Sequence, residues 1–160
     1  MTLPEQERER FCQVLHHSRT SLYRLAFSIT RNSSDAQEAV AEAVCRAYER
    51  YPQLREKEKL PRWLLKITAN EARRLCQRRG RTVSLDDLPT EPAIPGRETG
   101  DDTLWQAVQT LPRDQREAVV LFYYEDLPTE EIARIVGTSP GAVRVRLSRA
   151  REKLRSILKE

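Results

Sequence analysis

The feature of this sequence that most constrains its fold is the segment from Thr82 to Asp102, where no helical or strand period is maintained. Its proline and glycine residues are Pro89, Pro92, Pro95, Gly96 and Gly100. Because such residues interrupt regular structure, the segment predicts a flexible linker. It holds six acidic residues and one basic residue, so we expect it to repel DNA. The 160-residue chain therefore divides into a unit of residues 1–81, a linker of residues 82–102 and a unit of residues 103–160.

Hydrophobic residues recur at helical spacing on both sides of the linker, and no stretch shows the alternation of a strand. In the N-terminal unit, three apolar stripes begin at Phe11, Ala36 and Leu60. The clearest stripe comprises Ala36, Ala39, Val40, Ala43, Val44, Ala47 and Tyr51. Ser34 and Gln37 have the spacing of a capping box at its start. We predict an all-α chain of two small helical domains, the first a three-to-four-helix bundle.

The C-terminal unit has the pattern of a helix-turn-helix. Helices predicted over Thr129–Val136 and Pro140–Leu158 enclose the turn Gly137–Ser139. Gly137 suits the left-handed conformation that ends a helix, and the Ser139 hydroxyl can cap the next one. The helices predicted before this motif are Leu104–Leu111 and Pro112–Tyr124. We therefore expect a helix-turn-helix bundle.

The basic residues of the chain are concentrated in two segments, although its net charge is only +4. Residues Arg62–Arg81 and Arg144–Lys159 each hold seven basic residues and one acidic residue, a local charge of +6. Phosphate neutralisation supplies most non-specific affinity for nucleic acids, so the two segments indicate two contacts with a polyanion. Charge alone leaves two solvated helix faces as an alternative.

The helix predicted over Pro140–Leu158 separates apolar from basic residues. Its apolar stripe comprises Val143, Leu147, Ala150 and Leu154. The candidate DNA-binding residues are Ser139, Arg144, Val145, Arg146, Ser148, Arg149, Arg151, Lys153 and Arg155. Arginine can bind guanine O6 and N7 with two hydrogen bonds, and a helix N-terminus can hold phosphate. The pattern favours a recognition helix in the major groove over an αα-hairpin with a merely basic surface.

The helix predicted over Leu60–Arg78 carries a polar stripe opposite its apolar one. The stripe comprises Arg62, Lys66, Asn70, Arg73 and Gln77, with Arg74 and Arg78 beside it. Repulsion among these cations does not stabilise a helix that has only a structural role. A helix that lies along phosphates, by contrast, can bind them with these cations. We interpret the stripe as a nucleic-acid face, with a solvated face as the alternative.

Nothing in the sequence has the pattern of an active site, such as a nucleophile with a positioned base or a phosphate loop. His16 and His17 point about 100° apart on a helix, and the three cysteines have no CxxC spacing. We expect no enzymatic activity, no metal site and no cofactor. No apolar run approaches the roughly 20 residues of a membrane span, and the N-terminus lacks a signal-peptide pattern. We therefore expect a cytoplasmic protein without stable membrane insertion of its own.

Two parts of the sequence carry a resemblance to one known family. They are LPRDQREAVVLFYYEDLPTEEIARIVGTSPGAVRVRLSRAREKL in the C-terminal unit, and DAQEAVAEAVCRAYERY with LPRWLLKITANEARRLCQRR in the N-terminal unit. The C-terminal part resembles the fourth conserved region, and the N-terminal part the second region, of the extracytoplasmic-function (ECF) sigma factors of bacterial RNA polymerase, which are sigma-70-like. The matches have the order and spacing of the family and leave out little besides the linker.

This resemblance implies two promoter contacts and a polymerase contact. The fourth region would read the minus-thirty-five element, with Arg144, Val145, Ser148 and Arg149 at the base-facing positions. The second region would capture and melt the minus-ten element, with a flipped-out base held by the loop Tyr51–Pro61. The matching minus-ten residues are Arg62, Trp63, Lys66, Asn70, Arg73, Arg74 and Arg78, and those for the polymerase clamp are Asp35, Glu38, Glu42 and Arg46. The implied partners are core RNA polymerase (the clamp helices and flap of its large subunit), promoter DNA and an anti-sigma factor.

Two other classes of protein are weighed against a sigma factor. A repressor or activator with a helical sensing domain would bind a duplex operator unaided, usually as a dimer on symmetric half-sites. In a protein-binding helical adaptor, the two basic segments would have no function in binding nucleic acid. Neither class explains a basic stripe in the N-terminal unit, whereas a polymerase subunit that touches two promoter elements does.

Overall fold

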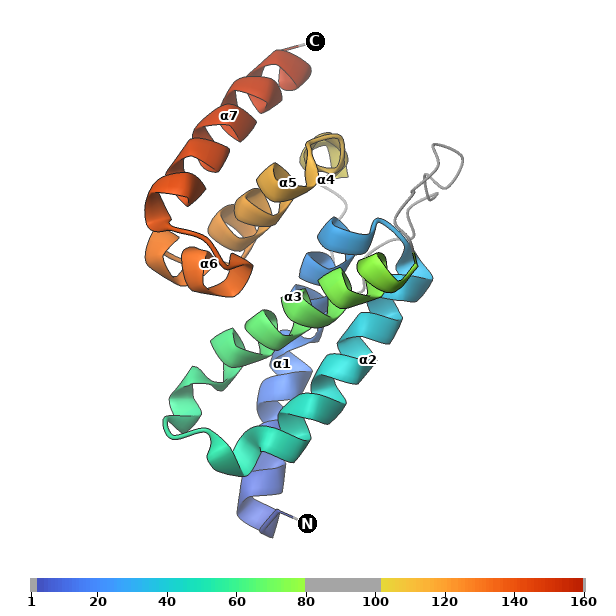
Figure 1. The fold of residues 1–160 in the computed structure, drawn as a ribbon, viewed down its shortest axis with the longest axis vertical. Coiled ribbons are helices and arrows are strands. Elements are labelled where there is room, and N and C mark those ends of the chain that lie inside the picture. The colour runs from blue at the N-terminus through green and yellow to red at the C-terminus, as the bar shows by residue number, and fades with distance from the viewer. Residues whose placement is uncertain (1–2, 80–101, 160) are drawn as a thin grey trace. The chain divides into compact units, whose positions relative to one another are not determined.

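The structure is a computed structural model that describes residues 3–79 and 102–159, and all regular structure in these ranges is helical (Figure 1). The all-α prediction is therefore confirmed. The chain divides into two compact units between Glu91 and Pro92, and each unit is considered by itself. Apart from Asp102, the predicted linker lies outside the described residues.

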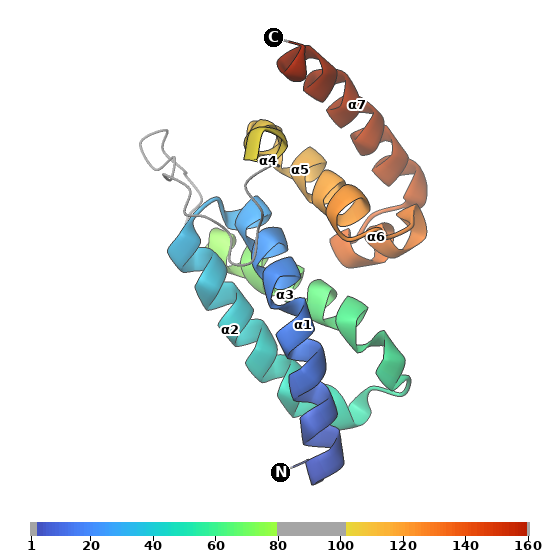
Figure 2. The same cartoon turned by 180° about the vertical axis from the view of Figure 1, so that it is seen from behind.

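The first unit is a bundle of α1 (Glu5–Thr30), α2 (Ser33–Arg50) and α3 (Leu60–Arg78). Each of these helices packs against the other two, as the two opposite views show (Figures 1 and 2). Its core contains Phe11, Leu22, Leu25, Ile29, Ala36, Ala39, Ala43, Ala47, Leu60, Leu64, Ala72 and Leu75. The apolar stripes that the sequence predicts are thus the packed faces, and the alanines of α2 let its neighbours approach closely.

The start of α2 differs from the predicted capping box at Ser34 and Gln37. Arg31 takes a left-handed conformation (φ 54°) and its amide donates to the Phe27 carbonyl, which closes α1. Only Asn32 then remains extended before α2, and its side-chain oxygen accepts the Asp35 amide at 2.9 Å. The short connection therefore makes Asn32 the N-cap, and Ser34 lies inside the first turn.

The connection between α2 and α3 is an ordered loop of two 3₁₀ turns, η1 (Tyr51–Gln53) and η2 (Lys57–Lys59). Tyr51 is fully buried and packs edge-on against Phe11, with ring centroids 5.4 Å apart. An aromatic anchor thus holds one end of a loop that is otherwise polar.

The second unit consists of α4 (Asp102–Gln109), α5 (Arg113–Val119), α6 (Thr129–Val136) and α7 (Pro140–Leu158). The last turn predicted for the helix through Tyr124 is a π-helical segment, η5 (Val120–Tyr124), that continues α5. α7 packs against each of α4, α5 and α6. The buried side chains include Trp105, Val108, Leu111, Leu121, Ile132, Val143, Leu147 and Ala150.

The turn between α6 and α7 has the predicted chemistry. Gly137 has φ +78°, and its amide donates to the Ala133 carbonyl at 2.8 Å. The Ser139 hydroxyl accepts the Ala142 amide at 3.1 Å and so caps α7. A glycine at the left-handed position and a capping serine together fix where α6 ends and α7 begins.

Candidate nucleic-acid interface

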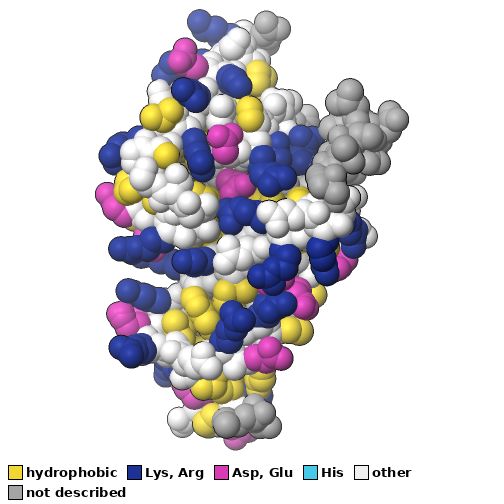
Figure 3. Space-filling view, viewed as in Figure 1, with side chains coloured by type: hydrophobic (Ala, Val, Ile, Leu, Met, Phe, Trp, Pro, Cys, Tyr) yellow, Lys and Arg dark blue, Asp and Glu magenta, His cyan; other side chains and the backbone are white. Residues whose placement is uncertain are grey.

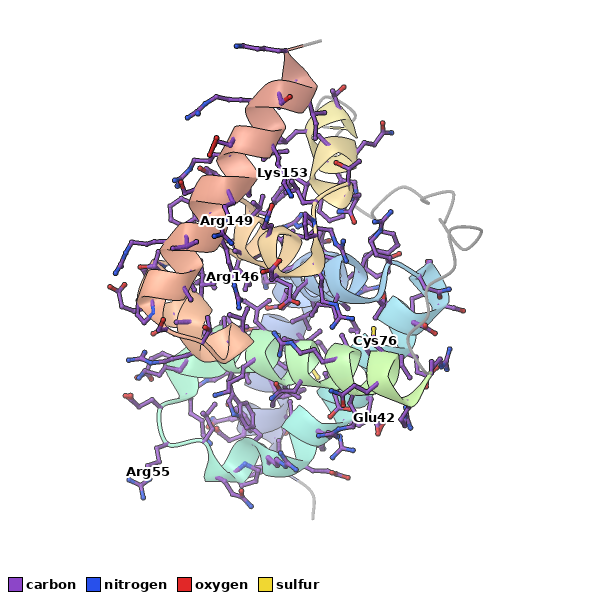
Figure 4. The ribbon with its side chains drawn as sticks, turned by 45° about the horizontal axis from the view of Figure 1, so that its top comes forward. Glu42, Arg55, Cys76, Arg146, Arg149 and Lys153 are labelled. Atoms are coloured by element: carbon purple, nitrogen blue, oxygen red, sulfur yellow. The ribbon has the colours of Figure 1, made fainter. Side chains whose placement is uncertain are left out.

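The recognition helix α7 has one buried side and one exposed side. The predicted apolar stripe is buried, with Val143 and Ala150 fully so. The candidate residues exposed to solvent are Ser139, Arg144, Val145, Ser148, Arg149, Lys153 and Arg155. Figure 4 shows Arg149 and Lys153 along this helix. An aliphatic side chain among these polar groups is unusual, and Val145 is 47% exposed. The helix therefore offers cations, a hydroxyl and a small apolar group on its exposed surface.

Two of the predicted DNA-binding arginines have partners inside their own unit. Arg146 is half-buried, and its Nε lies 3.7 Å from the Asp114 carboxylate of α5. Arg151 donates from Nε to the Tyr123 hydroxyl at 2.6 Å, and its guanidinium lies over the rings of Phe122 and Tyr123. These two arginines therefore attach α7 to the α5–η5 helix.

The polar stripe of α3 lies on the outer side of the first unit. Arg62, Lys66 and Asn70 are exposed, and Arg73 donates to the Asn70 side-chain oxygen at 3.4 Å. In the space-filling view, Lys and Arg side chains are spread over the face that carries α3 (Figure 3). The structure thus brings together the predicted outer residues of this helix.

A pocket of about 380 Å³ lies where this stripe meets the loop between α2 and α3. Its lining residues are Arg50, Gln53, Leu54, Arg55, Trp63, Lys66, Ile67 and Asn70. Figure 4 shows Arg55 extending outward from the loop. The lining combines a large aromatic surface, three cationic donors and two amides, and a nucleobase needs groups of both kinds, a ring surface and polar partners.

In the C-terminal half of α3, some of the polar side chains face α2 instead of continuing the exposed polar stripe. Glu71 is buried, forms an ion pair with Arg46 of α2 (Nε to carboxylate oxygen 2.7 Å) and accepts a hydrogen bond from Arg74 Nη1 at 3.1 Å. Arg78 lies 4.0 Å from Glu38. Of the predicted minus-ten residues, Arg74 and Arg78 are therefore paired with carboxylates.

The four predicted clamp residues of α2 lie beside this junction and take part in its ion pairs. Glu42 lies 3.8 Å from Arg46. Arg79 pairs with Asp35 and, at 3.0 Å, with Glu38. The sequence did not indicate Glu71 and Arg79 as partners of these residues. The sequence could indicate only the pair of Glu71 with Arg74, which are three residues apart on one helix. The contact between Glu71 and Arg46 forms only when two helices pack together.

The second unit also contains an apolar groove that the sequence analysis did not predict. Its volume is about 510 Å³, and its lining residues are Leu104, Val119, Tyr123, Tyr124, Arg151, Leu154, Arg155, Leu158 and Lys159. Leu104, Tyr123 and Leu158 are large hydrophobic side chains with 36%, 47% and 46% of their surface exposed. An exposed apolar patch beside three cations is typical of a surface that binds another protein.

Within residues 3–79 and 102–159, no group of three or more His, Cys, Asp or Glu residues could hold a metal ion. Cys12, Cys45 and Cys76 are free thiols. No helix in these ranges is long and apolar enough to cross a membrane.

Two family descriptions and several relatives match this chain. "Sigma-70 region 2" matches residues 14–82, and "Sigma-70, region 4" matches residues 101–154. The RNA polymerase sigma factor SigV of Bacillus subtilis is 33% identical over 135 residues, which cover 83% of this chain and 81% of SigV. The ECF RNA polymerase sigma factor EcfG of Rhodopseudomonas palustris is 32% identical over 143 residues, 86% of this chain and 79% of EcfG. The chain belongs to the ECF sigma factors.

Solved structures agree with this family. The sigma factor RpoE of Bartonella quintana, in complex with the anti-sigma factor NepR, matches the sigma factor described here with a TM-score of 0.78 and 28% identity. The match covers 94% of this chain and 98% of RpoE. CnrH, in complex with the cytosolic domain of CnrY, matches with a TM-score of 0.67 over 95% of this chain and 89% of CnrH. At 23% identity, the second match supports the fold alone.

The family establishes the activity. This ECF sigma factor directs core RNA polymerase to specific promoters and assists DNA melting during transcription initiation. Its partners are core polymerase and promoter DNA. The alternative of a stand-alone repressor or activator is not supported, because the segment Arg62–Arg81 and most of the segment Arg144–Lys159 fall within sigma-factor regions rather than in a sensing domain.

Proposed function

We propose that the two units of this sigma factor divide promoter recognition between duplex and single-stranded DNA. The observation that carries the proposal is the pocket between the α2–α3 loop and the polar stripe of α3, because a duplex-binding helix-turn-helix protein has no need of it. The second unit would read a closed duplex, and the first unit would hold a strand that has been opened.

In the second unit, α7 lies in the major groove at the minus-thirty-five element. Arg144 and Arg149 donate to guanine edges, Ser148 bonds to a neighbouring base, and Val145 contacts a thymine methyl group. Ser139, Lys153 and Arg155 bind phosphates. Arg146 and Arg151 contribute positive potential, and their contacts with Asp114 and Tyr123 hold α7 at a fixed angle to α5.

In the first unit, the opened minus-ten strand follows the polar stripe of α3. Arg62, Lys66 and Arg73 neutralise phosphates, with Asn70 among them. One extruded base enters the pocket and lies against Trp63. Arg74 and Arg78 lie beside the stripe and would exchange their carboxylate partners for phosphates of the strand.

Polymerase binds both units through surfaces other than the DNA faces. The clamp helices contact the ion-paired side of α2 at Asp35, Glu38, Glu42 and Arg46. The flap of the large subunit occupies the apolar groove of the second unit, where Leu104, Tyr123 and Leu158 are exposed. We also propose control by an anti-sigma factor, a cytoplasmic location and no enzymatic activity of the chain itself. The complex of RpoE with NepR supports the first of these.

Transcription from a promoter library, with core polymerase in the presence and absence of this chain, tests the proposal. We expect initiation only with the chain, from promoters that share two sequence elements at a constant spacing. Alanine substitution of Trp63 should then alter preference in the minus-ten element alone. Selection of a single palindromic duplex element, bound without polymerase, would contradict the proposed function.

A further inference from the structure

Lys57 makes three contacts within the loop between α2 and α3. Its ammonium donates to the backbone carbonyls of Tyr51 at 2.7 Å and Leu54 at 2.8 Å. It also lies 4.2 Å from the centroid of the Tyr51 ring. The side chain is half-buried, so the charge is partly removed from water. A charged donor shared by two carbonyls and a ring face connects parts of the loop that the backbone alone does not join.

The two carbonyls belong to functionally different residues. Leu54 lines the 380 Å³ pocket, whereas Tyr51 is fully buried against Phe11 and anchors the loop in the core. Burial raises the pKa of the Tyr51 phenol, and the Glu7 carboxylate adds to this effect, so the ring beneath the ammonium is neutral. Lys57 itself does not line the pocket. An effect of Lys57 on the shape of the pocket must therefore pass through the loop.

We infer that Lys57 is a positioning residue that holds the Tyr51–Lys59 loop in the shape that accepts an extruded base. The inference rests on the proposed function of the pocket. A loop tied in its binding conformation has lost its conformational freedom before the ligand arrives, so less ordering opposes binding. Without the ammonium, the Leu54 carbonyl would turn to water and the Tyr51 carbonyl would keep only the Leu54 amide as its donor, so Leu54 would leave the pocket wall.

The test compares Lys57→Met with Lys59→Met in holoenzyme formed from core polymerase and the full chain. Both variants remove one charge from the same loop and keep an unbranched side chain. Lys59 is exposed, and its ammonium lies 3.2 Å from the neighbouring Glu56 carboxylate. The probe is a fluorescent single-stranded oligonucleotide of the minus-ten element, with each of the four bases at the extruded position. We expect Lys57→Met to weaken binding about tenfold and to reduce base preference, and Lys59→Met to weaken it about twofold.

Hydrogen exchange in the free full chain gives a second, independent readout. The Leu54 amide donates to the Tyr51 carbonyl at 3.0 Å, so its exchange reports the loop itself. Lys57→Met should accelerate this exchange without changing exchange in α1–α3, and Lys57→Arg should restore much of the protection. Unchanged exchange, or equal loss of binding in both methionine variants, would overturn the inference. Failure of the wild-type holoenzyme to bind the strand would instead contradict the proposed function of the pocket.

Discussion

At the residue scale, identical side chains on α7 have different environments. Arg149 is exposed, whereas Arg146 and Arg151 are half-buried; Arg146 forms an ion pair with Asp114, and Arg151 donates a hydrogen bond to Tyr123. A guanidinium that already has a partner must exchange it to bind a base, which reduces the net gain. We therefore assign sequence reading to the exposed arginines and orientation of the helix to the two paired ones.

Substitution of single cations on α7 should separate base reading from phosphate binding. Arg144→Ala and Arg149→Ala should each weaken minus-thirty-five recognition by about 1–3 kcal/mol and relax base preference. Lys153→Ala should weaken binding to all sequences alike and reduce the slope of log affinity against log salt by about one. Holoenzyme binding to promoter variants at several salt concentrations measures both effects. Equal weakening on every promoter by all three variants would contradict the assignment.

Val145 allows a sharper test of base contact, because uracil differs from thymine by one methyl group. If Val145 packs against that methyl, replacing the thymine by uracil should weaken wild-type binding but leave Val145→Ala almost unaffected. A double-mutant cycle between protein and DNA isolates this interaction, which we expect to be about 1 kcal/mol. Additive losses in the cycle would show that Val145 does not touch the methyl group.

At the scale of the helix, the N-cap of α7 sets the start of the recognition helix. Ser139→Ala removes the bond to the Ala142 amide and should lower the free energy of unfolding by about 1 kcal/mol. Ser139→Asp keeps a capping oxygen, so its stability should be close to wild type, while its added charge weakens DNA binding. Denaturant unfolding and promoter binding distinguish these effects. Full stability of the alanine variant would mean that the cap contributes nothing.

The outer side of α2 should be required for assembly with polymerase. Asp35→Arg together with Glu42→Arg should abolish holoenzyme formation, because charge complementarity with the clamp helices is reversed. Glu42 is exposed and Asp35 is half-buried beside Arg79, and neither lies in the core. Circular dichroism should therefore show a folded variant. Co-purification of this folded variant with core polymerase at wild-type levels would remove the clamp assignment.

At the scale of the whole molecule, two small DNA-binding units share one promoter. The sequence predicts a flexible linker between them, so the chain by itself sets no fixed spacing. Holding both units on one DNA molecule costs conformational entropy. The free energy needed to open base pairs is also larger than the binding free energy that one short basic helix can supply. Polymerase supplies both a spacing and further contacts with DNA.

The free chain should accordingly be a poor DNA-binding protein. We expect weak, strongly salt-sensitive binding to promoter duplex and no opened bubble without core enzyme. Gel shifts at physiological salt and permanganate footprinting measure the two properties, with the holoenzyme as the positive control. Tight binding of the free chain to a promoter duplex would contradict this prediction, and it would mean that one unit alone supplies the sequence specificity.

The sequence by itself determined the helices and the faces they bury. Side chains three and four residues apart share a helix face, so the stripe from Ala36 to Ala47 identified a core face before any packing was known. Local chemistry likewise determined the turn at Gly137 and the cap at Ser139, because their partners lie within four residues. The nucleic-acid faces that we propose on α3 and α7 rest on the same periodicity applied to charge.

Tertiary structure decided which of the predicted charges have partners inside the protein. Arg46 and Glu71 lie on different helices, and so do Arg151 and Tyr123; no spacing within one helix encodes either contact. The pocket and the Lys57 contacts also depend on how a loop closes over α3. Helical periodicity acts over a few residues, whereas ion pairs and pockets form only when distant segments meet. The sequence therefore predicted the candidate interface as a set of residues, and packing showed which of them are exposed and which contact other helices of their own unit.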